Sequence, residues 1–497
     1  MTGKIEKQGL ANLVLLYAGI GLGLLNTILR TKALTAEEIG LIGILLSISS
    51  VTAFLIAFGL PAGILKFYGR FRSSVSQKTF YIIICLSIVT VLTLVASGVF
   101  DLVEPLLASK YDNPLLEQYI RYIYFLFLFG GFNVVLGTVL RAEHRTVFVN
   151  FTMSFFDRVL FLGFLSMMLI FPQLDFETYF WFFVGTYCLK TVMLALFLAR
   201  KVRLGKPSSA GFDRPLVKEM ATYSSFMLFA GLAGVITAAV DRLMLGYYVN
   251  LDAVGVYTIV LTFPMLLRMI GSGFGMIANP IIADCFHAGD MDEVQRIYSS
   301  NINIQLLLGG GFMAVFVAFG QPGLDFLGEA YSRGFWVMIF LATGEYLNIA
   351  TGMCGTIIAF SKKYRLDFYL RVFLLLIAVA TNMVLIPVLG IEGAAIATAS
   401  SLAIYNLGKV VYVRIKFRMQ PYSFTTLGVL SYSAALGIAL WLFQRFAQLS
   451  NIGLIIGVSA IAVLGYVLLG AVAFKLTPAI ELLETVDQLI GKGRKRR

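Results

Sequence analysis

Hydrophobic runs of about twenty residues recur along the whole chain and are separated by short polar segments. Within each run the apolar residues are continuous and do not alternate with polar ones, so the pattern indicates helices and not strands. A helix of about twenty residues is long enough to cross the ~30 Å hydrocarbon layer of a bilayer. The pattern predicts about fourteen such helices, at residues 9–31, 40–60, 79–99, 118–140, 150–171, 177–199, 221–248, 254–276, 301–320, 334–358, 367–387, 391–412, 423–443 and 452–474.

The composition also indicates a membrane protein. Apolar residues make up 59% of the 497 residues, charged residues make up only 13%, and the mean hydropathy is +0.86. Soluble domains carry about 25% charged residues. Only helices and closed barrels satisfy their backbone groups in hydrocarbon, so the predicted class is an all-α membrane protein. No loop between the predicted spans is long enough to form a soluble catalytic domain.

The net charge of +12 follows the predicted topology. Most Lys and Arg residues fall in or beside the loops on one side, including those within residues 66–78, 200–218, 362–371, 409–418 and 492–497. The loops on the opposite side hold few basic residues, namely Arg30, Lys32, Lys110, Arg333 and Arg445. The positive-inside rule therefore predicts a multi-pass protein of the cell (inner) membrane with both termini in the cytoplasm. Basic side chains then face anionic lipid headgroups, and nucleic acid is not an expected partner.

The two halves of the chain resemble each other at one constant sequence offset. Residues 39–41 (Ile-Gly-Leu) match residues 254–256 (Val-Gly-Val), and Asn26 matches Asp241. Further matches at the same offset are Pro172 with Pro387, Lys201 with Lys416 and Arg203 with Arg418. Each half has an even number of predicted helices, so the two repeats have the same orientation and are related by an axis along the membrane normal.

The repeat defines the expected domains. Residues 1–205 form an N-terminal six-helix lobe, residues 206–420 form a C-terminal six-helix lobe, and residues 421–475 hold two additional transmembrane helices. The boundary between the lobes falls in a linker-like stretch with Pro and Ser residues. Residues 476–497 are expected to form a cytoplasmic tail with a short amphipathic helix and a basic end, and a partly disordered tail is the alternative.

Metal and cofactor chemistry have little support in the sequence. The four cysteines, Cys85, Cys188, Cys285 and Cys354, are widely separated and show no metal-ligand spacing, so neither disulfides nor a cysteine metal site are implied. A histidine metal site is also not expected, because the chain has only two histidines, His144 and His287. We therefore expect no metal and no cofactor.

Three blocks of sequence resemble a known family. The first is residues 34–68, LTAEEIGLIGILLSISSVTAFLIAFGLPAGILKFY. The second is VDRLMLGYY at residues 240–248, followed by VGVY at residues 254–257. The third is NMVLIP at residues 382–387, followed by GIEGAAIAT at residues 390–398. Together they resemble the prokaryotic polysaccharide transporter family, the Wzx-type flippases, and the likeness runs through most of the first twelve predicted helices.

The resemblance implies a fold and a substrate class. The family belongs to a superfamily that includes multidrug exporters and lipid II flippases, and its members have two pseudo-symmetric six-helix lobes around a central cavity, a MATE-like fold worked by alternating access. The implied substrate is an oligosaccharide linked to a polyprenyl diphosphate, moved from the cytoplasmic to the outer leaflet for surface polysaccharide biosynthesis, such as O-antigen, capsule or exopolysaccharide. The implied partners are this lipid-linked oligosaccharide and the membrane lipids.

Ionisable side chains inside hydrocarbon are costly and usually face a cavity or a charged partner. A diphosphate headgroup needs positive charge along its path, and Arg is suited to bidentate phosphate contacts. The expected cavity residues are Asn26, Arg30, Asp241, Arg242 and Arg268. Asp241 and Glu345 are the candidate sites for a coupling ion, either a proton or sodium. Packing is the alternative for each of these residues, and a structural ion pair is expected at Asp157 and Arg158.

Several functions remain open from the sequence. The first is a flippase for glycan-lipids, with the lipid II flippase as a close relative. A cation-coupled multidrug exporter of the same fold is the second, although such exporters usually use acidic groups and the intramembrane set here is mostly basic. A membrane enzyme, such as a glycan polymerase or ligase, is the third; the outer loops are short for a catalytic site, so we expect no enzyme.

Overall fold

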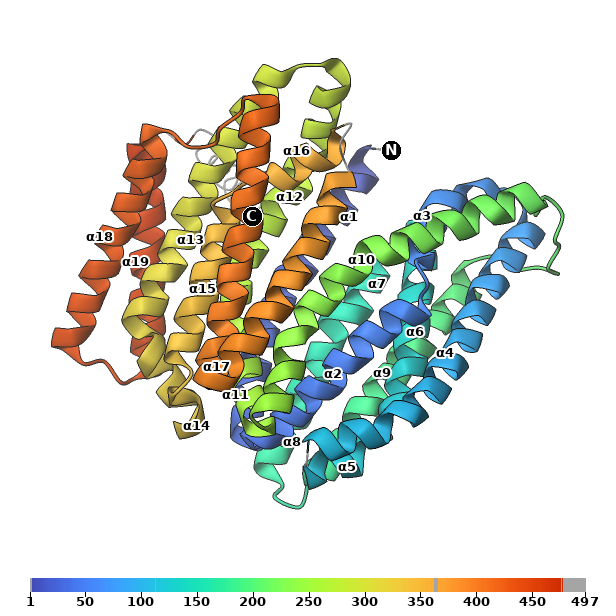
Figure 1. Cartoon of the computed structure of the whole chain (residues 1–497), viewed down its shortest axis with the longest axis horizontal. Helices are drawn as coiled ribbons and strands as arrows, with labels where there is room; N and C mark the ends of the chain where they lie inside the picture. Colours follow the sequence, from blue (N-terminus) through green and yellow to red (C-terminus); the bar gives the residue numbers. More distant parts are fainter. Residues whose placement is uncertain (1, 112, 362–364, 475, 477–497) are drawn as a thin grey trace, which may run out of the picture. The chain divides into compact units, whose positions relative to one another are not determined.

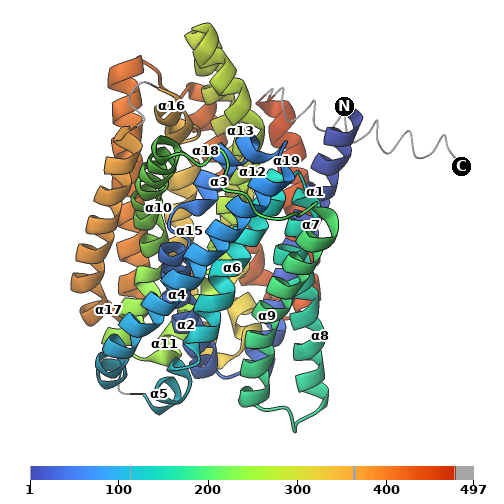
Figure 2. The same ribbon diagram turned by 90° about the vertical axis from the view of Figure 1, so that its right-hand side faces the viewer.

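The computed structural model describes residues 2–111, 113–361, 365–474 and 476, and every regular element among them is a helix (Figures 1 and 2). The helices up to residue 248 are α1 (Thr2–Ala33), α2 (Ala36–Ile56), α3 (Leu60–Phe71), α4 (Val75–Tyr111), α5 (Pro114–Ile120), α6 (Ile123–Ala142), α7 (Thr146–Asn150), the π-helix η1 (Phe151–Phe156), α8 (Asp157–Ile170), α9 (Phe176–Lys201) and α10 (Arg214–Tyr248). The later helices are α11 (Leu251–Val260), α12 (Thr262–Ala288), α13 (Met291–Leu327), α14 (Glu329–Ser332), α15 (Phe335–Ile349), α16 (Cys354–Phe360), α17 (Arg365–Phe417), α18 (Phe424–Ala447) and α19 (Ile452–Ala473).

The all-helical membrane class predicted from the sequence is confirmed. Among the described residues, ten helices are long and apolar enough to cross a membrane, and the number rises to twelve if each of two bent pairs counts as one span. The bent pairs are α11 with the start of α12, at 41°, and α15 with α16, at 47°. The long helix α17 consists of two helices that meet at Gly390, where the backbone is non-helical. The count of fourteen spans stays a prediction.

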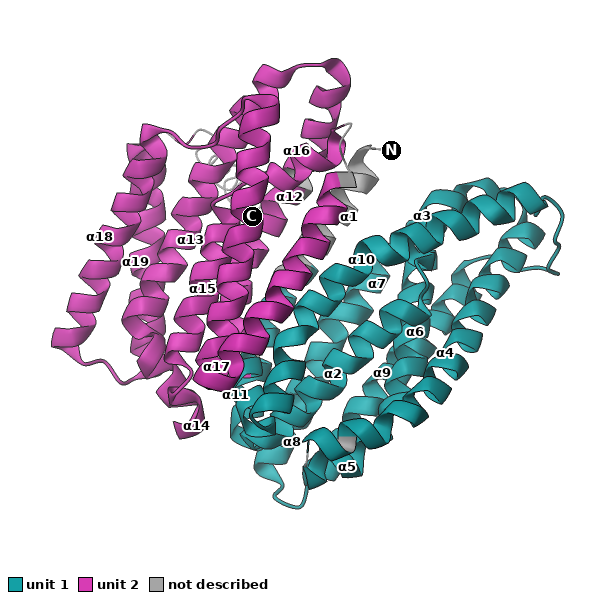
Figure 3. Cartoon of the chain, viewed as in Figure 1, with its two compact units in different colours: residues 1–258 teal, residues 259–497 magenta. Residues whose placement is uncertain are grey.

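The chain forms two compact units, residues 1–258 and residues 259–497 (Figure 3). Unit 1 includes α10, because α10 packs against α2 and α3. The lobes predicted from the repeat, residues 1–205 and 206–420, are defined by sequence offset, and their boundaries stay predictions. The expected amphipathic and basic tail lies outside the described residues, except for Leu476.

The start of α2 shows why the sequence begins a helix at this point. Thr35 has extended backbone angles, its hydroxyl accepts a hydrogen bond from the Glu38 amide, and the Glu38 carboxylate accepts one from the Thr35 amide at 2.8 Å. This capping box satisfies two amides that an apolar helix end would leave without partners. The body of α2 is then buried on most sides, as its continuous apolar sequence predicts.

α2 and α11 touch backbone to backbone inside unit 1. A Cβ atom built on Gly40 would lie 1.8 Å from the carbonyl oxygen of Leu251, and one built on Gly255 would lie 1.7 Å from the carbonyl oxygen of Ala36. Ala36 and Leu251, like Gly40 and Gly255, are separated by the offset of the repeat. Reciprocal contacts of this kind are the pattern that a two-fold axis produces. Only glycine fits at either position, because any side chain would overlap a carbonyl group.

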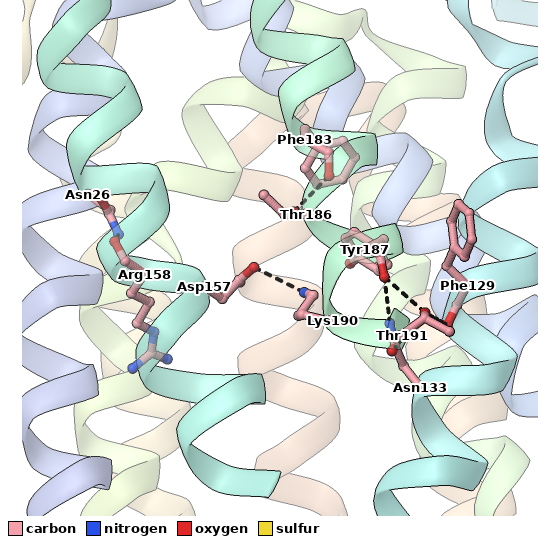
Figure 4. A network of polar contacts seen from close by, with 10 residues as sticks. All are labelled: Asn26, Phe129, Asn133, Asp157, Arg158, Phe183, Thr186, Tyr187, Lys190 and Thr191. Carbon is pink, nitrogen blue, oxygen red and sulfur yellow. Dashed lines mark hydrogen bonds and ion pairs between the residues drawn. The ribbon is translucent and has the colours of Figure 1, made fainter. Parts of the chain in front are cut away.

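A network of polar side chains lies in the interior of unit 1 (Figure 4). The Asp157 carboxylate on α8 pairs with the Lys190 ammonium on α9 at 3.1 Å, and this ammonium also lies 4.1 Å from the centre of the Tyr187 ring. The ion pair of Asp157 is therefore made with Lys190 and not with its neighbour Arg158. In Figure 4 the Arg158 side chain points away from this pair, and its guanidinium lies against Gly19 and Gly23 of α1.

Unit 2 is built around α13, which is buried along most of its length. α13 packs against α12, α15, α18 and α19, and α15 packs against α17. The outer faces of α18 and α19 expose large apolar side chains, as lipid-facing helices do: Leu427, Ile438, Phe446, Ile456, Ile461, Leu464, Leu469 and Val472. The two C-terminal helices thus cover one side of α13 and present their other side to lipid.

The glycine contact predicts strong effects of small substitutions. Gly40→Val and Gly255→Val should each destabilise the protein by at least about 3 kcal/mol, above the usual 1–3 kcal/mol of overpacking, because the added atoms meet backbone and not a movable side chain. Gly234→Val is the matched control in unit 1, since no heavy atom lies within 4 Å of its would-be Cβ. Size-exclusion chromatography of the heated, detergent-extracted variants measures the loss of folded protein. Equal stability of all three variants would contradict the close contact.

The ion pair in unit 1 predicts a double-mutant result. Asp157→Asn should destabilise the protein by about 3 kcal/mol, because it leaves the Lys190 ammonium buried without its carboxylate. The double variant Asp157→Leu with Lys190→Met should recover most of that loss. Glu293→Gln, which breaks the exposed Arg296–Glu293 pair, is the control and should cost less than about 1 kcal/mol. Thermal unfolding in detergent gives the comparison, and equal effects of the single and the double change would argue against a paired charge.

Candidate functional site

A polar pocket of about 430 Å³ lies inside unit 2, among α12, α13, α15, α16 and α17. Its polar and charged lining residues are Arg268, Ser272, Asn279, Gln305, Asn348, Thr351, Thr356, Arg371 and Lys409. Among the described residues, no Asp or Glu lines it. The lining is thus rich in hydrogen-bond donors and positive charge, although the surrounding helices are apolar enough to cross a membrane.

The break between α15 and α16 helps to form the pocket. The two helices bend by 47°, and Gly352 in the break has φ +55°, a left-handed conformation that glycine adopts at no steric cost. Gly352 and Gly355 of this segment line the pocket together with Gly271 and Gly275 of α12. A Cβ built on Gly355 would have no heavy atom within 4 Å. The sequence therefore keeps this wall free of bulky side chains.

Two of the three cations at the pocket are paired with carboxylates behind its wall. The Arg268 guanidinium donates to Glu345 from Nε at 2.9 Å and also from Nη2. Glu345 is only 3% exposed and accepts a further hydrogen bond from Asn348 at 3.3 Å. The Arg371 Nε donates to Asp367 at 2.8 Å. Both arginine side chains are about half exposed, and both line the pocket.

The third cation, Lys409 on α17, is placed differently. The residue is 7% exposed, and its ammonium lies 4.3 Å from the centre of the Tyr405 ring on the same helix. No carboxylate of the described residues pairs with it within 4.0 Å. A cation over an aromatic face gains about 0.5–2 kcal/mol, which is much less than a full counter-charge supplies in a poorly hydrated site.

Hydrogen bonds hold the pocket walls together. Asn406 donates to the Asn348 side chain at 3.0 Å and so joins α17 to α15, and Thr356 donates to the Asn279 side chain at 2.8 Å. In unit 1, Thr191 donates to the Asn133 side chain at 2.9 Å and joins α9 to α6. The repeat offset relates Asn133 to Asn348 and Thr191 to Asn406, so the two hydrogen bonds occupy equivalent places in the two halves.

The residues predicted from the sequence occupy both units. In unit 1, Asn26 is 7% exposed and donates to the Arg158 carbonyl at 2.8 Å, and the Arg30 guanidinium lies 5.9 Å from the centre of the Phe161 ring. These contacts connect α1 to α8. Asp241 is buried and accepts a hydrogen bond from Tyr257 at 2.8 Å. Arg242 donates to the Ala238 carbonyl of its own helix at 3.1 Å.

Of the predicted set, Arg268 lines the pocket of unit 2, and Glu345 lies behind it as its counter-charge. The expectation that all of these residues line one cavity stays a prediction.

Two charged residues of the pocket, Arg371 and Lys409, were not predicted from the sequence, because both lie among the basic residues near predicted helix ends on the cytoplasmic side. A usable signal for Lys409 existed in its helix, because Tyr405 and Asn406 precede it by four and three positions and so share its face. Chemically, the pocket combines three cations, amides and hydroxyls, a set suited to an anionic group that carries further polar atoms. No group of three or more potential metal ligands occurs among the described residues.

Comparisons with known proteins identify the family of the chain. The sequence profile of the family described as polysaccharide biosynthesis protein matches residues 31–333, which is more than half of the chain. A probable flippase, AglR of Haloferax volcanii, is 24% identical over an alignment of 190 residues that covers 35% of this chain and 37% of that protein. The matched region thus spans about a third of the length of this curated relative.

Solved structures share the fold at low sequence identity. The lipid II flippase MurJ in an inward closed conformation has a TM-score of 0.72 and 12% identity, over 93% of this chain and 98% of that chain. An inward-facing multidrug resistance MATE transporter of the MOP superfamily has a TM-score of 0.64 and 14% identity, over 80% of this chain and 94% of that chain. The MATE multidrug transporter DinF-BH has a TM-score of 0.58 and 16% identity, over 83% of this chain and 95% of that chain.

The resemblance and the MATE-like fold expected from the sequence are thereby confirmed. The chain is a multi-pass membrane protein with the fold of MOP-superfamily transporters, and it belongs to the polysaccharide biosynthesis protein family.

Proposed function

We propose that the protein is a flippase that moves polyprenyl-diphosphate-linked oligosaccharide from the cytoplasmic to the outer leaflet by alternating access. The export would serve the biosynthesis of a surface polysaccharide such as O-antigen, capsule or exopolysaccharide. The observation that carries this proposal is the cationic, amide-rich pocket among the membrane-spanning helices of unit 2. The family membership supports the link to polysaccharide, and the named flippase relatives support transport without a catalytic step.

The substrate explains why such a pocket is needed. A diphosphate and any acidic sugars carry negative charge, and hydrocarbon excludes charge unless a counter-charge accompanies it. Arginine offers planar pairs of donors that match phosphoryl oxygens, and amides and hydroxyls suit sugar hydroxyls. The pocket of unit 2 contains all three kinds of group. We assign Arg268 to substrate contact on this basis.

The other predicted residues keep their proposed roles. Asn26, Arg30, Asp241 and Arg242 remain proposed cavity residues, and Asp241 and Glu345 remain the proposed sites for a coupling proton or sodium ion. Glu345 is a suitable candidate because it forms an ion pair with Arg268. A change in the charge of Glu345 would therefore change how strongly Arg268 attracts an anion. We further propose the cell (inner) membrane as the location, with both termini in the cytoplasm, from the distribution of Lys and Arg.

Two alternatives share the fold. A lipid II flippase is favoured by the similarity to the lipid II flippase MurJ over nearly the whole chain. A multidrug exporter is favoured by the similarity to MATE transporters. The pocket argues against a cationic drug, because the described residues of its lining include no carboxylate and the two carboxylates behind it are already paired with arginines.

Deletion of the gene tests the proposal directly. Lipid-linked oligosaccharide should accumulate on the cytoplasmic face, because the carrier lipid cannot move its charged headgroup through the bilayer unaided. Labelling of intact and of opened cells with a membrane-impermeant sugar oxidant measures the amount on each face. The wild-type gene should restore outward glycan, whereas Arg268→Ala should not at equal protein abundance. Unchanged sidedness in a strain with no second flippase would overturn the proposal.

Obstruction of the pocket tests its place in transport. Gly355→Leu should reduce glycan export by at least about tenfold, the effect of ~1.4 kcal/mol, because Gly355 lines the pocket and no heavy atom lies within 4 Å of its would-be Cβ. Gly457→Leu is the matched control, since this glycine of α19 is exposed and also has no heavy atom within 4 Å of its would-be Cβ. Surface glycan and protein abundance are measured together. Equal export by both variants would remove the pocket from the transport path.

A further inference from the structure

The charges at the pocket of unit 2 do not cancel. Arg268, Arg371 and Lys409 contribute three positive charges, and the carboxylates that pair with them, Glu345 and Asp367, contribute two negative charges. One positive charge is therefore in excess. Arg268 and Arg371 each pair directly with a carboxylate, whereas Lys409 forms no ion pair within 4.0 Å among the described residues and the Asp367 carboxylate acts on it only from a longer distance.

A comparison with unit 1 shows a lysine of the same chain in a similar setting but with a counter-charge. Lys190 and Lys409 are both buried, at 8% and 7% exposure, and both place the ammonium over a tyrosine ring, at 4.1 and 4.3 Å. Lys190 also pairs with the Asp157 carboxylate at 3.1 Å, which neutralises its charge. Lys409 instead lines an open pocket. A buried ammonium without a counter-ion is costly, and such residues inside membranes mark binding sites and ion paths.

We propose that Lys409 binds a phosphoryl anion of the transported molecule, assisted by the guanidinium groups of Arg268 and Arg371, which line the same pocket. The inference rests on the proposed flippase function, in which this anion is the diphosphate of the polyprenyl carrier. A phosphoryl group fits better than a sugar carboxylate. The diphosphate bridge between the lipid and the sugar offers four non-bridging oxygens and two negative charges, whereas a carboxylate offers two oxygens and one charge, too few for three cationic donors.

The pocket size agrees with a headgroup as the occupant. Pockets of about 300–1,000 Å³ enclose ligands of drug size. At about 430 Å³ this pocket lies near the lower end of that range, so it can hold a diphosphate with adjoining atoms but not an oligosaccharide together with a polyprenyl chain. Amides of Asn279, Gln305 and Asn348 line the same space and can donate to the remaining phosphoryl oxygens.

The test uses the full-length protein in nanodiscs of neutral phosphatidylcholine and titration calorimetry with inorganic pyrophosphate. Lys409→Gln should weaken pyrophosphate binding by about ten- to a hundredfold, the usual value of a charge-assisted contact. Lys409→Arg should retain binding within about threefold, because it restores the charge. Lys416→Gln is the matched control, an exposed lysine of the same helix whose loss changes net charge equally, and it should bind as the wild type does.

Two further variants separate an anion site from a structural role. Asp367→Asn should tighten pyrophosphate binding, because it raises the excess positive charge at the pocket. Lys409→Gln should leave thermal stability unchanged or raise it, since it removes an uncompensated charge, whereas Lys190→Gln should lower stability by leaving Asp157 without its partner. Unchanged pyrophosphate binding by Lys409→Gln would overturn the proposal, as would a loss of stability equal to that of Lys190→Gln.

Additional titrations identify the source of the anion. Farnesyl diphosphate that competes with pyrophosphate supports a carrier-lipid headgroup, and glucuronate should not compete. Competition by glucuronate alone would assign the site to a carboxylate and overturn the phosphoryl assignment. Phosphatidylglycerol in the nanodiscs should leave the affinity unchanged; if it abolishes pyrophosphate binding, the site belongs to ordinary membrane lipid and the proposal fails. If the wild type binds pyrophosphate but gene deletion leaves glycan sidedness unchanged, the anion site stands and the flippase function fails.

Discussion

In hydrocarbon a charged side chain is stable only beside an opposite charge or within a shell of hydrogen-bond partners, and this constraint shapes the interior of both units. In unit 1 it joins Asp157 on α8 to Lys190 on α9. In unit 2 it places the Glu345 and Asp367 carboxylates beside Arg268 and Arg371. The same constraint makes Lys409 informative, because an uncompensated ammonium at a pocket has a cost that packing alone does not offset.

The repeat shows how equivalent helix contacts in the two halves can be surrounded by different charges. Equivalent hydrogen bonds, Thr191 to Asn133 and Asn406 to Asn348, join the corresponding helices in each half. Around this shared feature the charges differ. Unit 1 has a lysine paired with a carboxylate, whereas unit 2 has a lysine at a pocket lined by glycines and amides. We infer that the common hydrogen bond maintains helix packing and that the surrounding charges determine what each half binds.

Much of the fold could be predicted from the sequence because the bilayer imposes a length and a polarity on each span. The repeat offset also predicted that Gly40 and Gly255 are equivalent positions. It did not predict that the helices of these two glycines contact each other. The partner of Asp157 could not be predicted, since Lys190 lies on a different helix and the contact depends on the rotation of two helices about their axes. Lys409 was missed for a related reason. A lysine near a helix end is expected to contact lipid headgroups unless the direction of its side chain is known.

The excess charge at the pocket has a consequence for the proposed transport cycle. An empty pocket with one unpaired cation is poorly suited to a water-poor environment, whereas a bound phosphoryl anion gives that cation a counter-charge. A ligand shifts a conformational equilibrium only through its differential interaction with the two states. If the protein must pass through a conformation in which the pocket is less hydrated, the bound anion stabilises that conformation relative to the empty protein. The protein with bound substrate then changes conformation more readily than the empty protein, which couples headgroup binding to transport without any covalent step.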